Sequence, residues 1–395
     1  MILGIDASNI RMGGGLTHLV ELLNSAEPAV KRFKKVIVWG ASHTLSELPK
    51  RDWLELVHVN QLDRKLISRI YWQHLVLPKL AANSCDVLFV PGGSYSRNST
   101  PVVTMSQNLL PFESKEVFRF GLSWVLIRLF ILRFTQGRSF KKANGVIFLT
   151  KYAQNAVRNV IGDFMGRQAI IPHGINQEFY SSPKPQFNIK EYSFDQSFKF
   201  LYVSTVDMYK HQWQVVEAVA NLRKEGLPIE LDLIGPAYPR ALKKLQKALD
   251  QFDPESKFIH YHGPIPYRDL AKNTCQADGV IFASTCENLP IILLEAMASG
   301  VPIACSNSGP MPEILKDAGM YFDPENIESL YLALKMLLQD ESLREKVANL
   351  SYEYALEFSW HRCAKDTFNF LFSIAQSGHA VSDTTFTNSK IRKAI

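Results

Sequence analysis

Short, almost continuously apolar runs alternate with longer amphipathic stretches along the whole chain. Such runs suit parallel β-strands that are covered on both faces, whereas apolar positions three or four residues apart indicate helices between them. In the first half, the runs that we predict as strands are residues 2–6, 36–40, 86–90, 102–105, 145–149 and 169–172. In the second half, they are residues 200–203, 230–235, 258–262, 279–283 and 302–305. This alternation predicts an α/β protein with two doubly wound sheets.

The break between the two predicted domains falls in residues 181–197, which contain two prolines and show little periodicity. A stretch of this kind is typical of a linker. We therefore predict one domain over residues 1–180 and a second over residues 198–358. Residues 359–375 are expected to form a helix, and the polar, Ser/Thr-rich residues 376–395 a flexible tail.

Composition and charge narrow the class of protein. The chain has 395 residues, of which 46% are hydrophobic and 21% charged, as in soluble globular proteins. The net charge of +6 divides unevenly: residues 1–194 carry 24 basic and 13 acidic side chains (+11), and residues 195–395 carry 20 and 25 (−5). A basic half predicts a polyanionic partner, either nucleic acid or an anionic membrane. No nucleic-acid-binding module accompanies the charge, so we expect no nucleic-acid partner.

The five cysteines are widely spaced and form no Cys-x-x-Cys pair. This pattern indicates free thiols in a reducing compartment rather than a disulfide framework or a zinc site. The first residues have neither a basic segment nor a long apolar one, and the chain has no apolar run long enough to span a bilayer. We therefore expect a cytoplasmic protein.

Much of the positive charge of the first half lies in residues 112–143, where seven Lys and Arg face two Glu, a net charge of +5. The middle of this segment, residues 120–134, is apolar with arginines five positions apart. It is too short and too charged to span a bilayer, but it suits a helix in the membrane interface whose arginines reach anionic headgroups. The basic run over residues 31–35 favours the same interpretation. The alternative is a buried core helix whose two arginines form salt bridges.

Three consecutive glycines, Gly13, Gly14 and Gly15, follow the first predicted strand and open a predicted helix over residues 16–23. Glycines let a ligand approach the backbone closely, and the N–H groups at a helix N-terminus suit a diphosphate. The pattern is not the dinucleotide motif G-x-G-x-x-G. The alternative is a glycine-rich turn without a ligand.

A stronger pattern follows the strand predicted over residues 279–283. Glu287 lies in the loop that ends this strand, and Glu295 lies eight positions further, within a predicted helix. At about 100° per residue, an eight-residue step returns to nearly the same helix face, so the two carboxylates can hold different parts of one extended ligand. The backbone N–H groups of Asn288 and Leu289 would then face the anionic centre of that ligand. The alternative is a capped amphipathic helix with an exposed glutamate.

The stretch from Glu287 to Glu295, followed by Ala-Met-Ala-Ser-Gly-Val-Pro, resembles the signature of glycosyltransferase family 4 (glycosyl transferases group 1), which are retaining enzymes with the GT-B fold. Other segments occur in the family's order, namely Ile-Pro-His-Gly-Ile at residues 171–175, residues 306–315 and Phe-Ser-Trp at residues 358–360. The resemblance covers nearly the whole chain. It implies a GT-B architecture, in which two Rossmann-like doubly wound domains face each other across a cleft and the C-terminal helix returns to the first domain.

In this family the first glutamate of the signature contacts the transferred sugar and the second contacts the ribose of the nucleotide. The resemblance therefore implies that Glu287 holds the sugar and Glu295 holds the ribose.

A glycine-rich loop and an Arg/Lys pair bind the diphosphate in the family. Gly14 and Gly15 match the loop, and Lys210 matches the lysine of the pair. Thr205 stands where the arginine is usual, so this chain departs from the family by one phosphate cation. The hydroxyls of Ser204 and Thr205 are expected to donate hydrogen bonds there instead.

A second departure concerns Gln107 and Asn108, which stand where many relatives have a His-Asp pair near the reacting sugar. Neither amide relays a proton as an imidazole does. We expect either a positional role for these amides or the use of another group, for which His173 and His18 are candidates.

The resemblance implies a retaining hexosyltransferase that moves a sugar from a UDP- or GDP-sugar to a hydroxyl of a lipid-linked or membrane-associated glycan, with Glu287, Lys210 and Gln107 as its catalytic residues. The first domain would bind the acceptor and the second the nucleotide sugar. The absence of a D-x-D motif and of metal-ligand spacing predicts no metal and no cofactor. Residues 112–143 would contact the inner face of an anionic membrane, as suits polysaccharide biosynthesis. Alternatives are a GT-B-like epimerase or hydrolase and an inactive nucleotide-sugar-binding protein. A phosphorylase is a further alternative, but this chain lacks the lysine motif expected for its pyridoxal phosphate.

Overall fold

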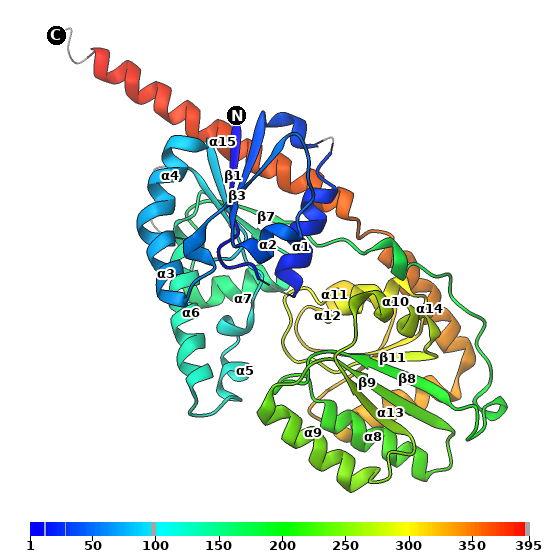
Figure 1. Ribbon diagram of the computed structural model, residues 1–395. Helices are drawn as coiled ribbons and strands as arrows, with labels where there is room; N and C mark the ends of the chain where they lie inside the picture. Colours follow the sequence, from blue (N-terminus) through cyan, green and yellow to red (C-terminus); the bar gives the residue numbers. More distant parts are fainter. Residues whose placement is uncertain (12, 28, 96–99, 392–395) are drawn as a thin grey trace. The chain divides into compact units, whose positions relative to one another are not determined.

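The computed structural model describes residues 1–11, 13–27, 29–95 and 100–391, with side chains as far as residue 377. The chain divides into two compact units (Figure 1). Unit 1 contains Met1–Phe112, Ile127–Gly174 and Trp360–Ile395, and unit 2 contains Glu113–Leu126 and Ile175–Ser359. The C-terminal helix therefore belongs to unit 1, as predicted.

Unit 1 is built on a parallel sheet of seven strands in the order β3-β2-β1-β4-β5-β6-β7. Strands β4, β5 and β6 are buried at every position, as their continuous apolar sequences predict. Strand β3 was not predicted, because this edge strand is only half-buried and its sequence, Leu-Glu-Leu-Val-His, interrupts the apolar run. The strands are β1 (Ile2–Asp6), β2 (Lys35–Gly40), β3 (Leu54–His58), β4 (Val87–Val90), β5 (Val102–Met105), β6 (Gly145–Phe148) and β7 (Arg167–Ile170).

Helices lie on both sides of this sheet (Figure 1), and α15 packs against α1 and β4. The helix α15 continues to Ile391, beyond residue 375, where the sequence analysis ends it, and residues 392–395 lie outside the described residues. The helices are α1 (Gly14–Asn24), α2 (Ser42–Ser46), α3 (Leu66–Tyr71), the π-helical turn η3 (Trp72–Val76), α4 (Leu77–Ser84), α6 (Trp124–Lys142), α7 (Lys151–Ile161) and α15 (Trp360–Ile391). The first three residues of α6 belong to unit 2 and the rest to unit 1.

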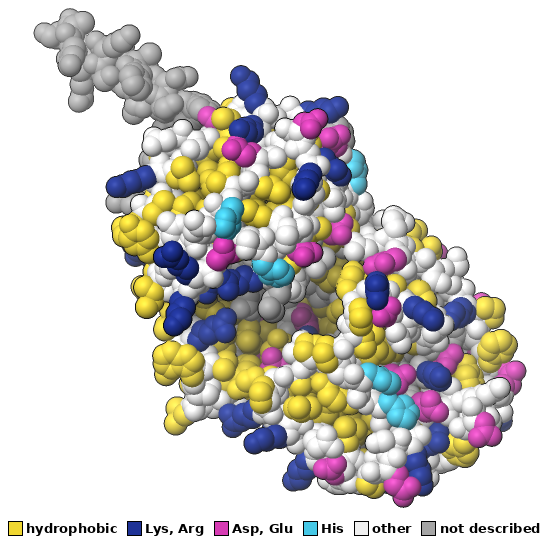
Figure 2. Space-filling view, in the orientation of Figure 1, with side chains coloured by type: hydrophobic (Ala, Val, Ile, Leu, Met, Phe, Trp, Pro, Cys, Tyr) yellow, Lys and Arg dark blue, Asp and Glu magenta, His cyan; other side chains and the backbone are white. Residues whose placement is uncertain are grey.

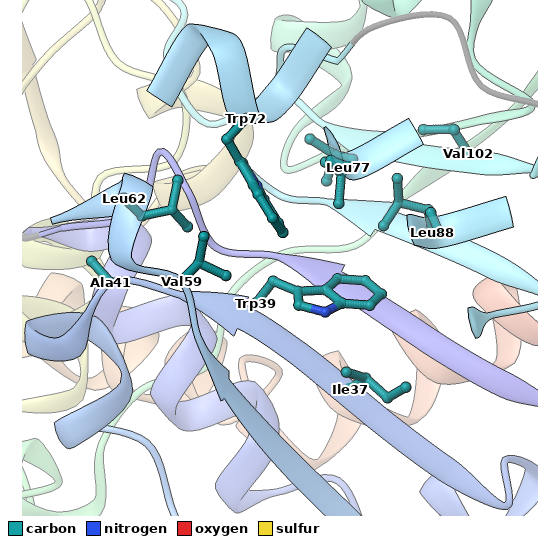
Figure 3. Close-up of a cluster of buried hydrophobic side chains, with 11 residues drawn as sticks. Ile37, Trp39, Ala41, Val59, Leu62, Trp72, Leu77, Leu88 and Val102 are labelled. Carbon is teal, nitrogen blue, oxygen red and sulfur yellow. The ribbon is translucent and has the colours of Figure 1, made fainter. Parts of the chain in front are cut away.

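Two tryptophans organise one of the hydrophobic clusters of unit 1. Trp39 projects from β2, and Trp72 points towards it from the π-helical turn (Figure 3). Both indoles are almost fully buried, together with Leu62 from the preceding loop. Burial of a large apolar side chain contributes about 1.5–3 kcal/mol, so this cluster fixes η3 and α4 against the sheet.

Unit 2 repeats the plan with a parallel sheet of six strands in the order β10-β9-β8-β11-β12-β13. The short edge strand β13 was not predicted. The strands are β8 (Phe198–Val203), β9 (Ile229–Ile234), β10 (Ile259–Gly263), β11 (Gly279–Phe282), β12 (Ile303–Ser306) and β13 (Met320–Phe322). The helices are α5 (Ser114–Phe118), α8 (Gln212–Lys224), α9 (Pro239–Phe252), α10 (Tyr267–Gln276), α11 (Ile291–Ala298), α12 (Met311–Leu315), α13 (Ile327–Gln339) and α14 (Glu341–Ala355).

The segment Glu113–Leu126 belongs to unit 2, although the sequence analysis places it inside the first domain. Charged groups hold it there. Arg119 Nη2 donates to Glu325 Oε1 at 2.7 Å, Lys115 forms an ion pair with the same carboxylate, and Arg240 Nη1 donates to the carbonyl of Phe120 at 2.8 Å. Burial alone would raise the pKa of Glu325, but the hydrogen bonds from Lys115 and Arg119 lower it to about 2.

Residues 181–197 also belong to unit 2 and are bound along its surface, whereas the sequence analysis treats them as a linker. The backbone N–H of Ser181 donates to the carbonyl of Ala298 at 3.0 Å. The fully buried Arg344 on α14 donates from Nε to Gln186 Oε1 at 3.1 Å and also donates to the carbonyl of Phe187. Its Nη1 donates to the carbonyls of Leu337 and Leu338 at 2.7 and 2.6 Å, so one guanidinium joins this segment to the end of α13.

The α6 helix exposes apolar side chains that a core helix would bury. Trp124 is 77% exposed and Phe134 71%, and Ile127 and Ile131 are also exposed on the same helix. The alternative of a buried core helix is therefore wrong for this face. Among the described residues, no helix combines the length and the apolar character needed to cross a membrane.

We predict that Arg344→Met destabilises unit 2 by about 3 kcal/mol, because the carbonyls of Leu337, Leu338 and Phe187 lose their buried donor. Differential scanning calorimetry should show a lower transition temperature for one of the two units, and limited proteolysis should cut residues 181–197 faster. Arg268→Met, which removes a largely exposed arginine of the same unit, is the control and should change neither. Equal stability of the Arg344→Met protein and the control would contradict this account.

Candidate active site

The loops that follow β8 and β11 form the edge of unit 2 where most predicted site residues lie. The two strands are parallel neighbours, with Phe200 opposite Gly279. Their carboxyl ends therefore meet at the same edge of the sheet, which is where ligands bind in open α/β sheets. The first loop carries Ser204, Thr205 and Lys210, and the second carries Glu287, Asn288 and Leu289.

The ammonium of Lys210 forms an ion pair with Oε1 of Glu287, so the structure brings together the two residues predicted to hold the diphosphate and the sugar. The side chains are only 10% and 15% exposed. The ammonium also lies 5.5 Å from the centre of the Phe282 ring and 5.3 Å from that of Tyr209. With little water around it, this ion pair interacts more strongly than an exposed one.

Four residues that are not among the predicted site residues, Tyr209, His211, Thr285 and Glu116, hold the two loops together. The backbone N–H of Thr285 donates to the carbonyl of Tyr209 at 2.9 Å, and His211 Nε2 lies 3.2 Å from Thr285 Oγ1. Thr285 Oγ1 also donates to Glu116 Oε2 at 2.7 Å. His211 adopts the left-handed conformation (φ 54°) before α8, and burial lowers its pKa. Glu116 lies 169 positions from Thr285, so no local sequence signal indicates this contact.

Glu295 lies on α11 and is almost completely buried. Burial raises the pKa of its carboxyl to about 8, although a hydrogen bond from the Tyr267 hydroxyl, at 2.5 Å, lowers it in part. The helix begins only at Ile291, after Pro290, so Glu287 lies outside it. The prediction that both glutamates share one helix face is therefore wrong, and Glu287 is placed by the loop after β11 rather than by the helix.

The other predicted donor-binding groups of unit 2 lie in the same two loops. Thr205 is exposed, and its carbonyl accepts a hydrogen bond from Gln212 Nε2 at 3.0 Å. Asn288 and Leu289 are buried between β11 and α11. Thr205 is thus accessible to a ligand, whereas Asn288 and Leu289 are covered.

In unit 1, the structure brings the glycine loop together with Gln107. Gly14 and Gly15 form the first turn of α1, after Gly13 with φ 68°. A side-chain carbon at Gly15 would lie 2.8 Å from Gln107 Oε1, so any larger residue at this position would force the Gln107 amide to shift. Asn108 is exposed, and its Oδ1 accepts a hydrogen bond from the backbone N–H of Leu110 at 3.2 Å, as in a turn-forming asparagine.

His173 and His18, the candidate proton-transfer groups, lie together in the interior of unit 1. Their Nδ1 atoms are 2.9 Å apart, and the Trp360 ring lies 5.5 Å from the His173 ring. Burial lowers the pKa of His18 to about 4 and that of His173 well below its usual value, so both rings are neutral near pH 7. This environment suits a packing role for His173 between α1 and the start of α15.

One group of described residues has ligand atoms close enough to hold a metal ion. Atoms of His18, His173 and Cys363 lie within 4.8 Å of one another, and all three residues are buried. The contact between the two Nδ1 atoms already uses one lone pair and one proton. Burial also raises the pKa of the Cys363 thiol to about 12, so the sulfur is protonated near pH 7 rather than ready as a thiolate ligand.

Comparison with solved structures identifies the architecture. Sucrose-phosphate synthase of Thermosynechococcus elongatus matches 98% of this chain and 100% of its own, with a TM-score of 0.70 and 16% identity. HepE of Anabaena, solved with UDP-glucose, matches 97% of this chain and 99% of its own, with a TM-score of 0.62 and 16% identity. Identities this low show the fold alone. They confirm the predicted GT-B architecture with two Rossmann-like units.

Comparison of sequences adds a family match in unit 2. Residues 184–354 match the family model of glycosyl transferases group 1. O-antigen chain mannosyltransferase B of Escherichia coli is 35% identical over 112 residues, which are 28% of this chain and 29% of that protein. A D-inositol 3-phosphate glycosyltransferase of Paenarthrobacter aurescens is 25% identical over 214 residues, 52% of each protein. The matches thus span between 29% and 52% of these relatives, and they support a glycosyltransferase.

We predict that Glu295 makes the stability of unit 2 depend on pH. Its folded-state pKa of about 8 lies above the usual value of 4.5, so folding favours the protonated carboxyl. This contribution is fully present below pH 4.5 and is lost as pH rises to about 8, at up to about 1.4 kcal/mol per pH unit. Glu295→Gln is neutral at every pH. Its stability relative to the unmodified protein should therefore increase between pH 5 and pH 8.

Urea unfolding at several pH values measures this difference, with the exposed Glu345→Gln as the matched control. The control should follow the unmodified protein at each pH. Parallel pH profiles for Glu295→Gln and the unmodified protein would show that the carboxyl is ionised in the folded state and would contradict the prediction.

Proposed function

We propose that the protein is a retaining, metal-independent hexosyltransferase that moves a sugar from a UDP- or GDP-sugar to a hydroxyl of a lipid-linked or membrane-associated glycan. The observation that carries this proposal is the shielded pair of Lys210 and Glu287 at the carboxyl ends of β8 and β11. A cation for phosphate and a carboxylate for sugar hydroxyls lie side by side there, inside the segment that matches the family model.

Each site residue has a proposed task. Lys210 stabilises the negative charge that develops on the departing diphosphate, a preorganised electrostatic role. Glu287 accepts hydrogen bonds from hydroxyls of the transferred sugar, and Glu295 contacts the ribose. Gly14 and Gly15 offer the N–H groups of the first turn of α1 to the diphosphate.

In the proposed reaction, the bond between the anomeric carbon and the phosphate oxygen breaks, and its electron pair stays on the diphosphate. The acceptor oxygen forms the new bond on the same face of the sugar, and its proton passes to the departing phosphate oxygen. No side chain has to take the proton in this route. That suits a site in which Gln107, held beside Gly15, replaces an imidazole and can only position the sugar.

The proposed acceptor is membrane-borne, and the domain over residues 1–180 binds it while the domain over residues 198–358 binds the donor. Support comes from the net charge of +5 in residues 112–143 together with the exposed apolar side chains of α6. A helix with this composition lies in a membrane interface, so the protein would sit peripherally on the inner face of the membrane. The likeness to an O-antigen chain mannosyltransferase supports a place in polysaccharide biosynthesis.

We predict that Glu287→Gln and Lys210→Ala each lower the transfer rate by about 10²–10³-fold, because each removes one preorganised electrostatic contact. A thermal-shift panel of UDP- and GDP-sugars identifies the donor, and mass spectrometry of extracted lipids then measures transfer. A reaction without acceptor separates transfer from epimerisation or hydrolysis of the donor.

Removal of one partner of a shielded ion pair also destabilises the fold, so a folded control is required. The double variant Lys210→Met/Glu287→Gln leaves no unpaired charge and should fold but remain inactive. The exposed Lys243→Ala and Glu345→Gln should keep full activity. Full transfer by both single variants would contradict the assigned site, and the absence of a shift with any nucleotide would contradict the proposed donor.

A further inference from the structure

A groove of about 510 Å³ lies between α6 and α7 in unit 1. The two helices approach each other at its base, where a side-chain carbon at Gly137 would lie 2.9 Å from Cγ2 of Ile161. Glycine at this position therefore lets the helices meet, and the longer side chains on either side form the walls. The groove is lined by Phe130, Arg133, Phe134, Gly137, Arg138, Lys141, Lys142, Val160 and Ile161.

The lining combines two chemical characters. Phe130, Phe134, Val160 and Ile161 give it an apolar surface, and the two phenylalanines are exposed. An exposed phenyl ring gains about 1.5–3 kcal/mol when an apolar partner covers it fully. The surface thus favours a ligand with a hydrocarbon part.

Apart from Gly137, the other lining residues are cations, namely Arg133, Arg138, Lys141 and Lys142, and no lining residue is acidic. Lys141 Nζ donates to the carbonyl of Ile161 at 3.4 Å, so its ammonium is turned towards the groove at the end of α7. The nearby carboxylate of Asp163 is paired with Arg158 at 3.8 Å. Four positive groups beside an apolar surface complement an anion that carries a hydrocarbon chain.

The exposed apolar side chains of α6 continue from the groove towards the start of the helix, through Ile131, Ile127 and Trp124. Figure 2 shows yellow and dark blue side chains close together over the part of unit 1 where α6 lies in Figure 1. The groove is thus continuous with the face of α6 that we propose to lie in the membrane interface.

We propose that this groove binds the phosphate group of a membrane lipid, with Lys141, Lys142, Arg133 and Arg138 around the phosphate and the start of the hydrocarbon chain against Phe130 and Phe134. The inference deepens the proposed membrane attachment, on which it rests, but it does not depend on sugar transfer. A free phosphate fits less well, because it leaves the two exposed rings in water. A carboxylate offers two acceptor oxygens and a sulfate ester one negative charge, whereas a phosphate monoester offers three acceptor oxygens and a charge of about −1.5 to −2, which suits four cationic donors better.

The test is sedimentation with vesicles of phosphatidylcholine alone or with one-fifth phosphatidic acid, without donor or acceptor. Lys141→Gln/Lys142→Gln should weaken binding to the phosphatidic acid vesicles about tenfold or more, since each cation near an anionic surface contributes about 1 kcal/mol. Phe134→Gln should also weaken it. Lys50→Gln/Lys79→Gln removes two exposed cations elsewhere in unit 1 and should stay within about twofold of the unmodified protein.

Three outcomes would overturn the inference. The first is equal loss in the two double-lysine variants, which indicates a diffuse charge effect. The second is unchanged binding of Lys141→Gln/Lys142→Gln with its circular dichroism intact. The third is full displacement of the protein from the vesicles by 10 mM glycerol 3-phosphate, a concentration that fills sites of about millimolar affinity. This result would show that the groove binds a soluble phosphate and does not need the hydrocarbon chain. A loss of lipid binding with sugar transfer to a soluble acceptor retained separates this site from the proposed catalytic one.

Discussion

The ion pair between Lys210 and Glu287 is the constraint on which the rest of unit 2 depends. Two charges with so little exposure persist only if each compensates the other and the surrounding groups stay neutral. The neighbouring phenols meet this requirement: burial, and then the charge of Glu287, raise the pKa of Tyr202 and Tyr209. The contacts of Thr285 with Tyr209 and Glu116 prevent the two loops from separating and exposing the pair.

This pair also explains how a site with one phosphate cation can work in the proposed reaction. Lys210 and Glu287 together carry no net charge, so a diphosphate must compete with the carboxylate for the ammonium. In the proposed mechanism, a phosphate that binds the ammonium releases Glu287 to accept hydrogen bonds from the sugar. The proposed diphosphate and sugar positions are thereby coupled, because breaking the ion pair costs free energy that both ligand groups together must offset. A second cation at position 205 would reduce this cost. The coupling favours a complete nucleotide sugar over a free sugar.

The sequence predicts most reliably the strands that are buried on both faces. The central strands of both sheets carry continuous apolar runs, and most predicted bounds lie within two residues of the observed ones. The edge strands β3 and β13 were missed because half-exposed strands carry no such run. In the site, the signature identified Glu287 and Glu295, but it could not show that Pro290 delays the helix or that Tyr267 covers Glu295. Contacts such as those of Arg344 and Glu116 join residues far apart in sequence, so only the fold shows them.

Positive charge has two different uses in this protein. In residues 113–126 of unit 2, the cations Lys115 and Arg119 form ion pairs with the Glu325 carboxylate, and these pairs hold the segment in place. The cations of the groove all lie on α6, next to two exposed phenylalanines, and the groove lining contains no acidic residue. Exposed apolar area favours aggregation, and like charges close together repel one another in the folded state. A ligand that covers the apolar surface and neutralises the cations relieves both effects. A membrane lipid can do this while it stays in the bilayer, because its phosphate and the start of its hydrocarbon chain lie next to each other at the bilayer surface.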